Sequence, residues 1–356
     1  MEKPMQDGGA KYTYKDFSLT LCQVFSALAV ITLHANSSFW SYTGTENNWF
    51  IANVIESIFY FAVPIFFMIT GITLLDYPER YSTKEYFKKR AKKVFVPYLF
   101  WSIAGVIYLL ASGRITKEEL TPLWLINGLV SGAGIIEYFW YFRALLFVYI
   151  CIPVFAWIDK SRKLDVIRYI LFAFFFLNIL VPFINQGFDL GLEWDFEMTK
   201  IAGYLFFAFG GYYIYKRPPA LQYKILIYVL GAAGLAMHLI GTYKLSTEYG
   251  AIIAYFKGYC NVPSVLYSFA VFVLLCDLSK MISRVNWLKK AVEIMGQYTL
   301  PAYLLQWFIF KLVDDLIGLN TQTISYRLLM PWFIYAVIML IVWVLRKIPV
   351  IRATVP

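Results

Sequence analysis

The stretch ALAVITLHANSSFW, residues 27–40, is an apolar run that ends in a histidine and then becomes polar and aromatic. His34 is one of only two histidines in 356 residues. An imidazole has an ordinary pKa of about 6.5, so it can take the proton of a hydroxyl group at working pH. A histidine that only bridges two helices would give the same pattern. These residues alone therefore leave a catalytic and a structural role open.

Further polar side chains fall inside long apolar segments, among them Glu56, Arg143 and Gln306. Placing such groups in the bilayer interior costs free energy, so they usually face a water-filled cavity and a polar partner. A neighbouring Glu56 could orient the His34 ring and stabilise the imidazolium, and Arg143 could stabilise an oxyanion. The alternative is an ion pair between Glu56 and Arg143 or Lys311 that only fixes two helices together.

No catalytic or metal-binding role is expected for His238, Asp314, Asp315 or the cysteines. His238 precedes the polar stretch GTYKLSTEYG and is expected at the membrane interface, while Asp314 and Asp315 close an apolar segment and are expected to be solvated. The four cysteines are scattered without any metal-ligand spacing. We therefore expect structural cysteines and no metal site.

The segment RYSTKEYFKKRAKK, residues 80–93, is strongly basic. Such a segment can anchor a membrane protein on anionic headgroups. It can also bind a polyphosphorylated ligand, because Arg90 and Lys93 lie three residues apart on one helical face, with Lys89 beside them. Spacing does not choose between the two roles.

The elements that must position these groups are membrane helices. The chain is 60% hydrophobic and only 15% charged, and its apolar runs are long enough to cross a bilayer. They lack the alternation of a β-barrel, so an all-α polytopic protein is expected. A shorter apolar piece, 120–131, is too brief to cross. About ten spans are predicted, near residues 18–40, 49–75, 94–112, 138–158, 166–185, 200–215, 223–243, 256–276, 294–317 and 327–346.

Charge gives this bundle a predicted orientation. With both termini in the cytoplasm, most of the 32 Lys and Arg residues fall in cytoplasmic segments, as the positive-inside rule requires. Topology thus explains most of the net charge of +10, and nucleic-acid binding is not expected. No cleavable signal is recognised in the polar segment 1–16 or after it, and residues 1–356 are expected to form one membrane domain.

Several of these stretches, in order, resemble acyltransferase family 3, whose members O-acylate polysaccharides, lipid-linked glycans and other envelope substrates. The stretches that carry the resemblance are ALAVITLHA, VPIFFMITGITLL, YFKKRAKKVFVPYLFW, YFWYFRALLFVYICIP, YLFFAFGGYYIYK and GQYTLPAYLLQWFIF. His34 stands where the family has its proposed catalytic histidine. Gln23 and Gln306 stand where the family commonly has an arginine and a histidine, and Tyr138 and Phe139 replace a histidine before Trp140. The resemblance therefore implies a divergent member.

The resemblance implies a multi-pass enzyme of the bacterial cytoplasmic membrane that uses acetyl-CoA, or another acyl-CoA, as donor substrate and binds no resident cofactor. Arg90, Lys93 and Lys89 would hold the nucleotide phosphates, and the pantetheine arm would pass Gln23 toward His34. Arg143, Gln306 and Trp140 would contact the substrate or the oxyanion. A cell-surface or lipid-linked sugar would be the acceptor.

The alternative function is a polysaccharide or small-molecule transporter that performs no covalent chemistry. The aromatic stretch NSSFWSYTGTENNW, residues 36–49, suits stacking on sugar rings under either function, or it is an ordinary interfacial aromatic belt. A membrane sensor or scaffold is not favoured, because no polar segment is long enough to fold as a separate domain.

Overall fold

The computed structural model describes residues 14–42, 44, 46–194 and 202–356, and these residues contain helices and no β-strand. The expected all-α class is therefore confirmed. The α-helices are α1 (Tyr14–Ala35), α2 (Glu46–Phe59), α3 (Ala62–Leu74), α4 (Thr83–Arg90), α5 (Val96–Ala111), α6 (Pro122–Ser131), α7 (Trp140–Ala156), α8 (Lys160–Phe174), α9 (Val181–Phe188), α10 (Gly203–Lys216), α11 (Leu221–Ala236), α12 (Thr242–Tyr249), α13 (Val262–Ile282), α14 (Asn286–Gly296), α15 (Thr299–Ile317) and α16 (Ile324–Leu345).

Short segments join these helices. The π-helical segments are η3 (Ala91–Phe95), η5 (Phe175–Leu180) and η6 (Met237–Gly241). The 3₁₀ segments are η1 (Ser37–Trp40), η2 (Tyr77–Glu79), η4 (Glu137–Phe139), η7 (Ala254–Phe256) and η8 (Ile351–Thr354). Each π segment continues the helix before it into the helix after it, so α4 with α5, α8 with α9 and α11 with α12 form long continuous rods.

Within the described residues, eight helical stretches are long and apolar enough to cross a membrane. They are Phe17–Ala35, Asn48–Glu79, Thr83–Ala111, Glu137–Ala156, Lys160–Phe188, Leu221–Tyr249, Val262–Ile282 and Ile324–Leu345. The other two predicted spans coincide with α10, which has only 14 residues, and α15, which carries three charged residues near its end. The short apolar piece forms the 10-residue helix α6. A polytopic membrane protein is thus confirmed, while the number of ten and the side of the termini stay predictions.

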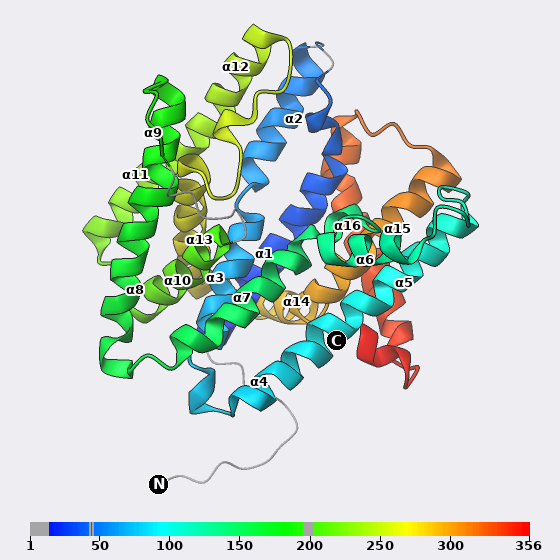
Figure 1. Ribbon diagram of the computed structural model, residues 1–356, viewed down its shortest axis with the longest axis horizontal. Coiled ribbons are helices and arrows are strands. Elements are labelled where there is room, and N and C mark those ends of the chain that lie inside the picture. The colour runs from blue at the N-terminus through cyan, green and yellow to red at the C-terminus, as the bar shows by residue number, and fades with distance from the viewer. Residues whose placement is uncertain (1–13, 43, 45, 195–201) are drawn as a thin grey trace.

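Helix α1 is the central element of the bundle. It packs against α3, α13, α14, α15 and α16, and most of its surface is buried. Figure 1 shows α8, α9 and α11 on one side of α1 to α3, and α5, α6, α15 and α16 on the other side. Because α1 carries both Gln23 and His34, its position places these two side chains inside the protein rather than against lipid.

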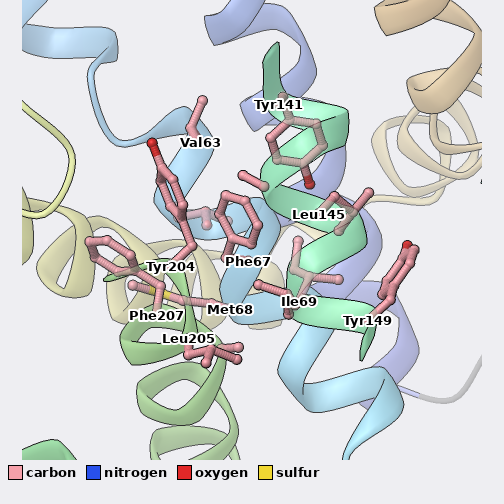
Figure 2. Packing of buried hydrophobic residues seen from close by; sticks show 14 of the residues in the cluster. Val63, Phe67, Met68, Ile69, Tyr141, Leu145, Tyr149, Tyr204, Leu205 and Phe207 are labelled. Atoms are coloured by element: carbon pink, nitrogen blue, oxygen red, sulfur yellow. The ribbon is translucent and has the colours of Figure 1, made fainter. Parts of the chain in front are cut away.

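The contact between α3 and α10 is unusually close. A Cβ atom on Gly71 would lie 1.9 Å from the carbonyl oxygen of Ala208, so only glycine permits this backbone approach. Figure 2 shows Phe67 and Met68 of α3 facing the side chains of α10, and the rings of Phe67 and Tyr204 stack with centroids 4.5 Å apart. Small residues allow such packing in membranes, where association depends on close van der Waals contact.

Charged side chains fasten the ends of the bundle. Asp76, after α3, accepts a hydrogen bond from Tyr212 at 2.8 Å and forms ion pairs with Lys163 at 3.3 Å and Lys216 at 2.7 Å. Arg327 of α16 is almost fully buried and donates to Ser38 Oγ, Gln322 Oε1 and the carbonyl oxygen of Asn48. These contacts tie segments far apart in the sequence to α3 and α16.

The change Gly71→Ala tests the close contact. The added methyl group overlaps the α10 backbone, so we expect a loss of about 1–3 kcal/mol of stability and a lower melting temperature of the detergent-solubilised protein. Ala111→Leu, which adds bulk at an exposed position of α5, is the control and should leave the melting temperature unchanged. An unchanged melting temperature for Gly71→Ala would show that the helices are not in this contact.

Candidate functional site

The cavity around His34, here called the histidine cavity, has a volume of 290 Å³. Elements from the whole length of the chain build it, because α1, α2, α3, α7 and α15 each contribute to its wall. Its lining residues are Val30, Leu33, His34, Trp40, Glu56, Tyr60, Val63, Trp140, Tyr141, Tyr259 and Tyr303. The structure therefore brings His34, Glu56 and Trp140 together, as their predicted roles require.

The His34 ring is held in one tautomer. Its Nδ1 lies 2.9 Å from Oε1 of Gln306, and the amide nitrogen of Gln306 donates to the carbonyl oxygen of Tyr303 at 3.2 Å. Because the amide nitrogen is already used, an oxygen faces the ring and Nδ1 must carry the hydrogen. The lone pair is then on Nε2. A histidine in this tautomer is set up to accept a proton at Nε2.

Tyr138 fixes the plane of the same ring. Its aromatic ring stacks on His34 with centroids 3.6 Å apart and planes 4° from parallel. Gln306 is completely buried and Tyr138 is partly buried. The predicted task of orienting the imidazole thus falls to Gln306 and Tyr138 rather than to Glu56. The stacking partner could not be read from the sequence, because Tyr138 lies more than a hundred residues from His34.

Glu56 lies in the wall of the histidine cavity with only 3% of its surface exposed. It accepts a hydrogen bond from Asn36 Nδ2 at 3.1 Å, and Asn36 also donates to the carbonyl oxygen of Ala52. In the described residues no hydrogen bond joins Glu56 to His34. The two side chains thus face the same cavity without a direct bond between them.

A buried cation lies behind this carboxylate. Lys257 is 5% exposed, donates to Ser57 Oγ at 2.8 Å, and lies 5.3 Å and 5.5 Å from the ring centroids of Phe39 and Tyr60. It precedes the candidate span Val262–Ile282, and burial lowers the pKa of its ammonium to about 8, while Glu56 opposes that shift. No role was assigned to Lys257 from the sequence, where its only signal is a lysine within the aromatic stretch AYFKGY.

Arg143, by contrast, is exposed on α7 and lines neither cavity. Lys311 pairs with Glu137, with Nζ and Oε1 3.6 Å apart. Among the described residues, Glu56 forms no ion pair with Arg143 or Lys311, which was the alternative expected from the sequence. This placement gives no support to an oxyanion role for Arg143, because the side chain lines neither cavity.

A second cavity, here called the basic cavity, has a volume of 580 Å³. Gln23, Arg90 and Lys93 line it, as the predicted donor site requires. Arg80 and Arg346 line it as well, and sequence analysis did not assign them to the site. Gln23 and His34 are 11 residues apart, which is about 16 Å along α1, so the two cavities lie at different depths of the same helix.

Two side chains of the basic segment differ in their environment. Arg90 packs over the Tyr149 ring at 5.7 Å, and its Nε is buried without a hydrogen-bond partner. Lys89 instead lies over Tyr81 at 4.1 Å, with its Nζ 4.0 Å from Glu85, and it does not line the cavity. The predicted phosphate contact of Lys89 is therefore not supported by its position, whereas that of Arg90 is.

The two cavities share Tyr141 and Tyr303 in their walls. Trp40 lies at the other end of the histidine cavity with 51% of its surface exposed. Trp49 is 3% exposed and donates to the carbonyl oxygen of Phe39, so it is a packing residue. Of these tryptophans in the stretch 36–49, only Trp40 is placed to stack on a sugar at the site.

His238 was expected at the membrane interface, and its depth in the membrane stays a prediction. The side chain is completely buried, with Nε2 3.2 Å from Ser264 Oγ and its ring 5.0 Å from that of Tyr60. It lies in the π-helical segment η6, which turns it into the bundle. Asp314 and Asp315 are exposed, as expected, and Asp315 pairs with Arg114.

The helical bundle and its histidine cavity define an integral membrane protein with a site suited to proton transfer from a hydroxyl group. The model of the acyltransferase domain of acyltransferase family 3 matches residues 16–346, nearly the whole chain. The chain belongs to this family, and the resemblance noted in its sequence is confirmed. No curated protein and no solved structure matches the chain.

The exchange Gln306→Leu tests the tautomer. Without the amide oxygen, Nδ1 loses its acceptor and the ring can turn or change tautomer, so we expect acyl transfer to slow about 10²-fold with little change in donor KM. Initial rates of donor consumption measure the effect. Gln222→Leu, the same change at an exposed position of α11, is the control and should keep the wild-type rate. A wild-type rate for Gln306→Leu would contradict a role of Gln306 in fixing the tautomer of His34.

Proposed function

We propose that this protein is a membrane O-acyltransferase, most simply an acetyltransferase that moves an acetyl group from acetyl-CoA to a hydroxyl of a cell-surface or lipid-linked glycan. The observation that carries the proposal is the meeting of two cavities at Tyr141 and Tyr303. One cavity holds the oriented base His34 and the other is lined by cationic side chains. A phosphorylated donor and a hydroxyl acceptor can therefore approach the same point from different sides.

The donor would bind in the basic cavity. Arg80, Arg90 and Lys93 provide charge-assisted hydrogen bonds for the nucleotide phosphates of acyl-CoA. The unpartnered Nε of Arg90 is a donor ready for such a phosphate oxygen. The pantetheine arm then lies beside Gln23 and brings the thioester toward His34. In the predicted orientation this cavity faces the cytoplasm, where acyl-CoA is found.

The acceptor would bind in the histidine cavity, with its sugar ring stacked on Trp40 at the exposed rim. His34 Nε2 removes the proton of the acceptor hydroxyl, and the oxygen attacks the thioester carbonyl carbon. The carbon–sulfur bond then breaks, and the departing thiolate of CoA takes the proton from the imidazolium. The products are an acyl ester and free CoA, and His34 is neutral again.

Charge in the cavity would favour this step. Glu56 would stabilise the imidazolium that forms, and the positive charge of the buried Lys257 favours the ionised form of this carboxyl group. The hydroxyl of Tyr60 accepts the N–H of Gly258 at 2.9 Å, so its own proton is available to an oxyanion. Tyr60 thus takes the part first given to Arg143. We place the enzyme in the cytoplasmic membrane of a bacterium, which supplies both substrates.

His34→Gln tests the function directly. We expect cells that carry this variant at wild-type protein level to lose the acetyl ester from their glycans, because a glutamine side chain cannot take the proton of the acceptor hydroxyl. Mass spectrometry of glycans from cells with and without the protein measures it, and the mass difference identifies acyl group and acceptor together. Glycans that are acylated equally by His34→Gln and by the wild-type protein would exclude the catalytic assignment.

Arg90→Gln tests the donor site separately. The loss of one phosphate contact should raise the donor KM about tenfold and leave kcat almost unchanged. Lys89→Gln is the matched control, because Lys89 lies in the same basic segment but outside the cavity. The alternative function, a transporter with two opposed cavities, predicts that the wild-type protein neither binds acetyl-CoA nor releases free CoA.

A further inference from the structure

Tyr141 and Tyr303 are the side chains, among the described residues, that line both cavities. Their rings meet edge to face, with centroids 5.4 Å apart and planes at 66°. Tyr141 is buried and Tyr303 is partly buried. The two rings thus stand between the cation-lined space and the base, where any donor that reaches His34 has to pass.

One face of α7 leads from the cations to this pair. Tyr149, Leu145 and Tyr141 are four residues apart and lie on successive turns of the helix, as Figure 2 shows. All three line the basic cavity, and Tyr149 contacts Arg90. The distance from Tyr149 to Tyr141 is about 12 Å along the helix axis. An extended, mostly uncharged arm attached to a phosphate held at Arg90 would follow this face toward Tyr141.

Tyr303 is also connected to both partners of the His34 ring. Its carbonyl oxygen accepts from the amide of Gln306, and its hydroxyl donates to the carbonyl oxygen of Tyr138. Gln306 holds Nδ1 of His34, and Tyr138 stacks on the same ring. The side chain that separates the cavities is therefore part of the framework that fixes the base.

We propose that Tyr141 and Tyr303 form the subsite for the thioester end of the donor: the ring pair closes the passage between the cavities, and the pantetheine arm passes between the rings to place the thioester carbonyl beside His34. The inference rests on the proposed function. Both residues are positioning residues, because they set where the thioester stops and they keep water from the cytoplasmic side away from it.

This role has a measurable consequence. A thioester that is loosely held and open to water is hydrolysed instead of transferred. Removing one ring should leave the phosphates bound at Arg90 and Lys93 but widen the passage. Hydrolysis of the donor should then rise while transfer falls. If the two tyrosines only stabilised the fold, replacing either of them would lower hydrolysis and transfer together, in step with the amount of folded protein.

The experiment uses the full chain in nanodiscs, with acetyl-CoA and membranes that contain the acceptor. Free CoA is measured without acceptor, as hydrolysis, and esterified acetyl is measured with acceptor, as transfer. For Tyr141→Ala and Tyr303→Ala we expect the ratio of hydrolysis to transfer to rise about tenfold or more, with CoA affinity within a factor of about two of the wild-type protein. Tyr141→Phe keeps the ring and should keep the wild-type ratio.

A second measurement does not depend on acyl transfer. In sealed liposomes, the Ala variants should admit a small uncharged sugar faster than the wild-type protein does, because the ring pair no longer separates the cavities. An unchanged ratio together with unchanged sugar entry, in variants that bind CoA normally, would overturn the role of the pair. If the wild-type protein does not bind CoA, the proposed function is rejected. Faster sugar entry in the Ala variants would even then support the separation of the two cavities by the ring pair.

Discussion

Polar side chains inside an apolar bundle must find their partners within the protein, because the bilayer interior offers none. This constraint organises the site. His34 of α1 is bonded to Gln306 of α15, Glu56 of α2 to Asn36 after α1, and Lys257 to Ser57 of α2. The first and the last of these bonds join residues 272 and 200 positions apart in the sequence. The polar groups that can perform chemistry are therefore also the groups that fix how the helices are placed.

The neutral residues Gln23 and Gln306 are compatible with this arrangement. An amide oxygen accepts the Nδ1 proton of an imidazole as well as a second ring nitrogen would, so Gln306 keeps the tautomer that a base needs. Gln23 brings no charge to the basic cavity, but Arg80, Arg90, Lys93 and Arg346 line the same space. The positive charge of the basic cavity is thus distributed over other elements.

A reaction between substrates from opposite sides of a membrane needs a connected path that does not leak. In the proposed reaction the two cavities and the tyrosine pair between them would meet this requirement. The close contact of α3 with α10 supports the same region, since Phe67 of α3 packs on Tyr141 of α7 and on Tyr204 of α10.

The sequence by itself determined the membrane class, most spans and the family, and it predicted site roles for His34, Arg90 and Lys93, which line the two cavities. Hydropathy and helical spacing are local properties, so local patterns report them. Only the tertiary structure decided that Arg143 points outward, that Lys257 is buried behind Glu56, and that Gln306 rather than Glu56 orients the base. These outcomes depend on the rotation of each helix about its axis and on partners as many as 272 residues away, which no local pattern contains.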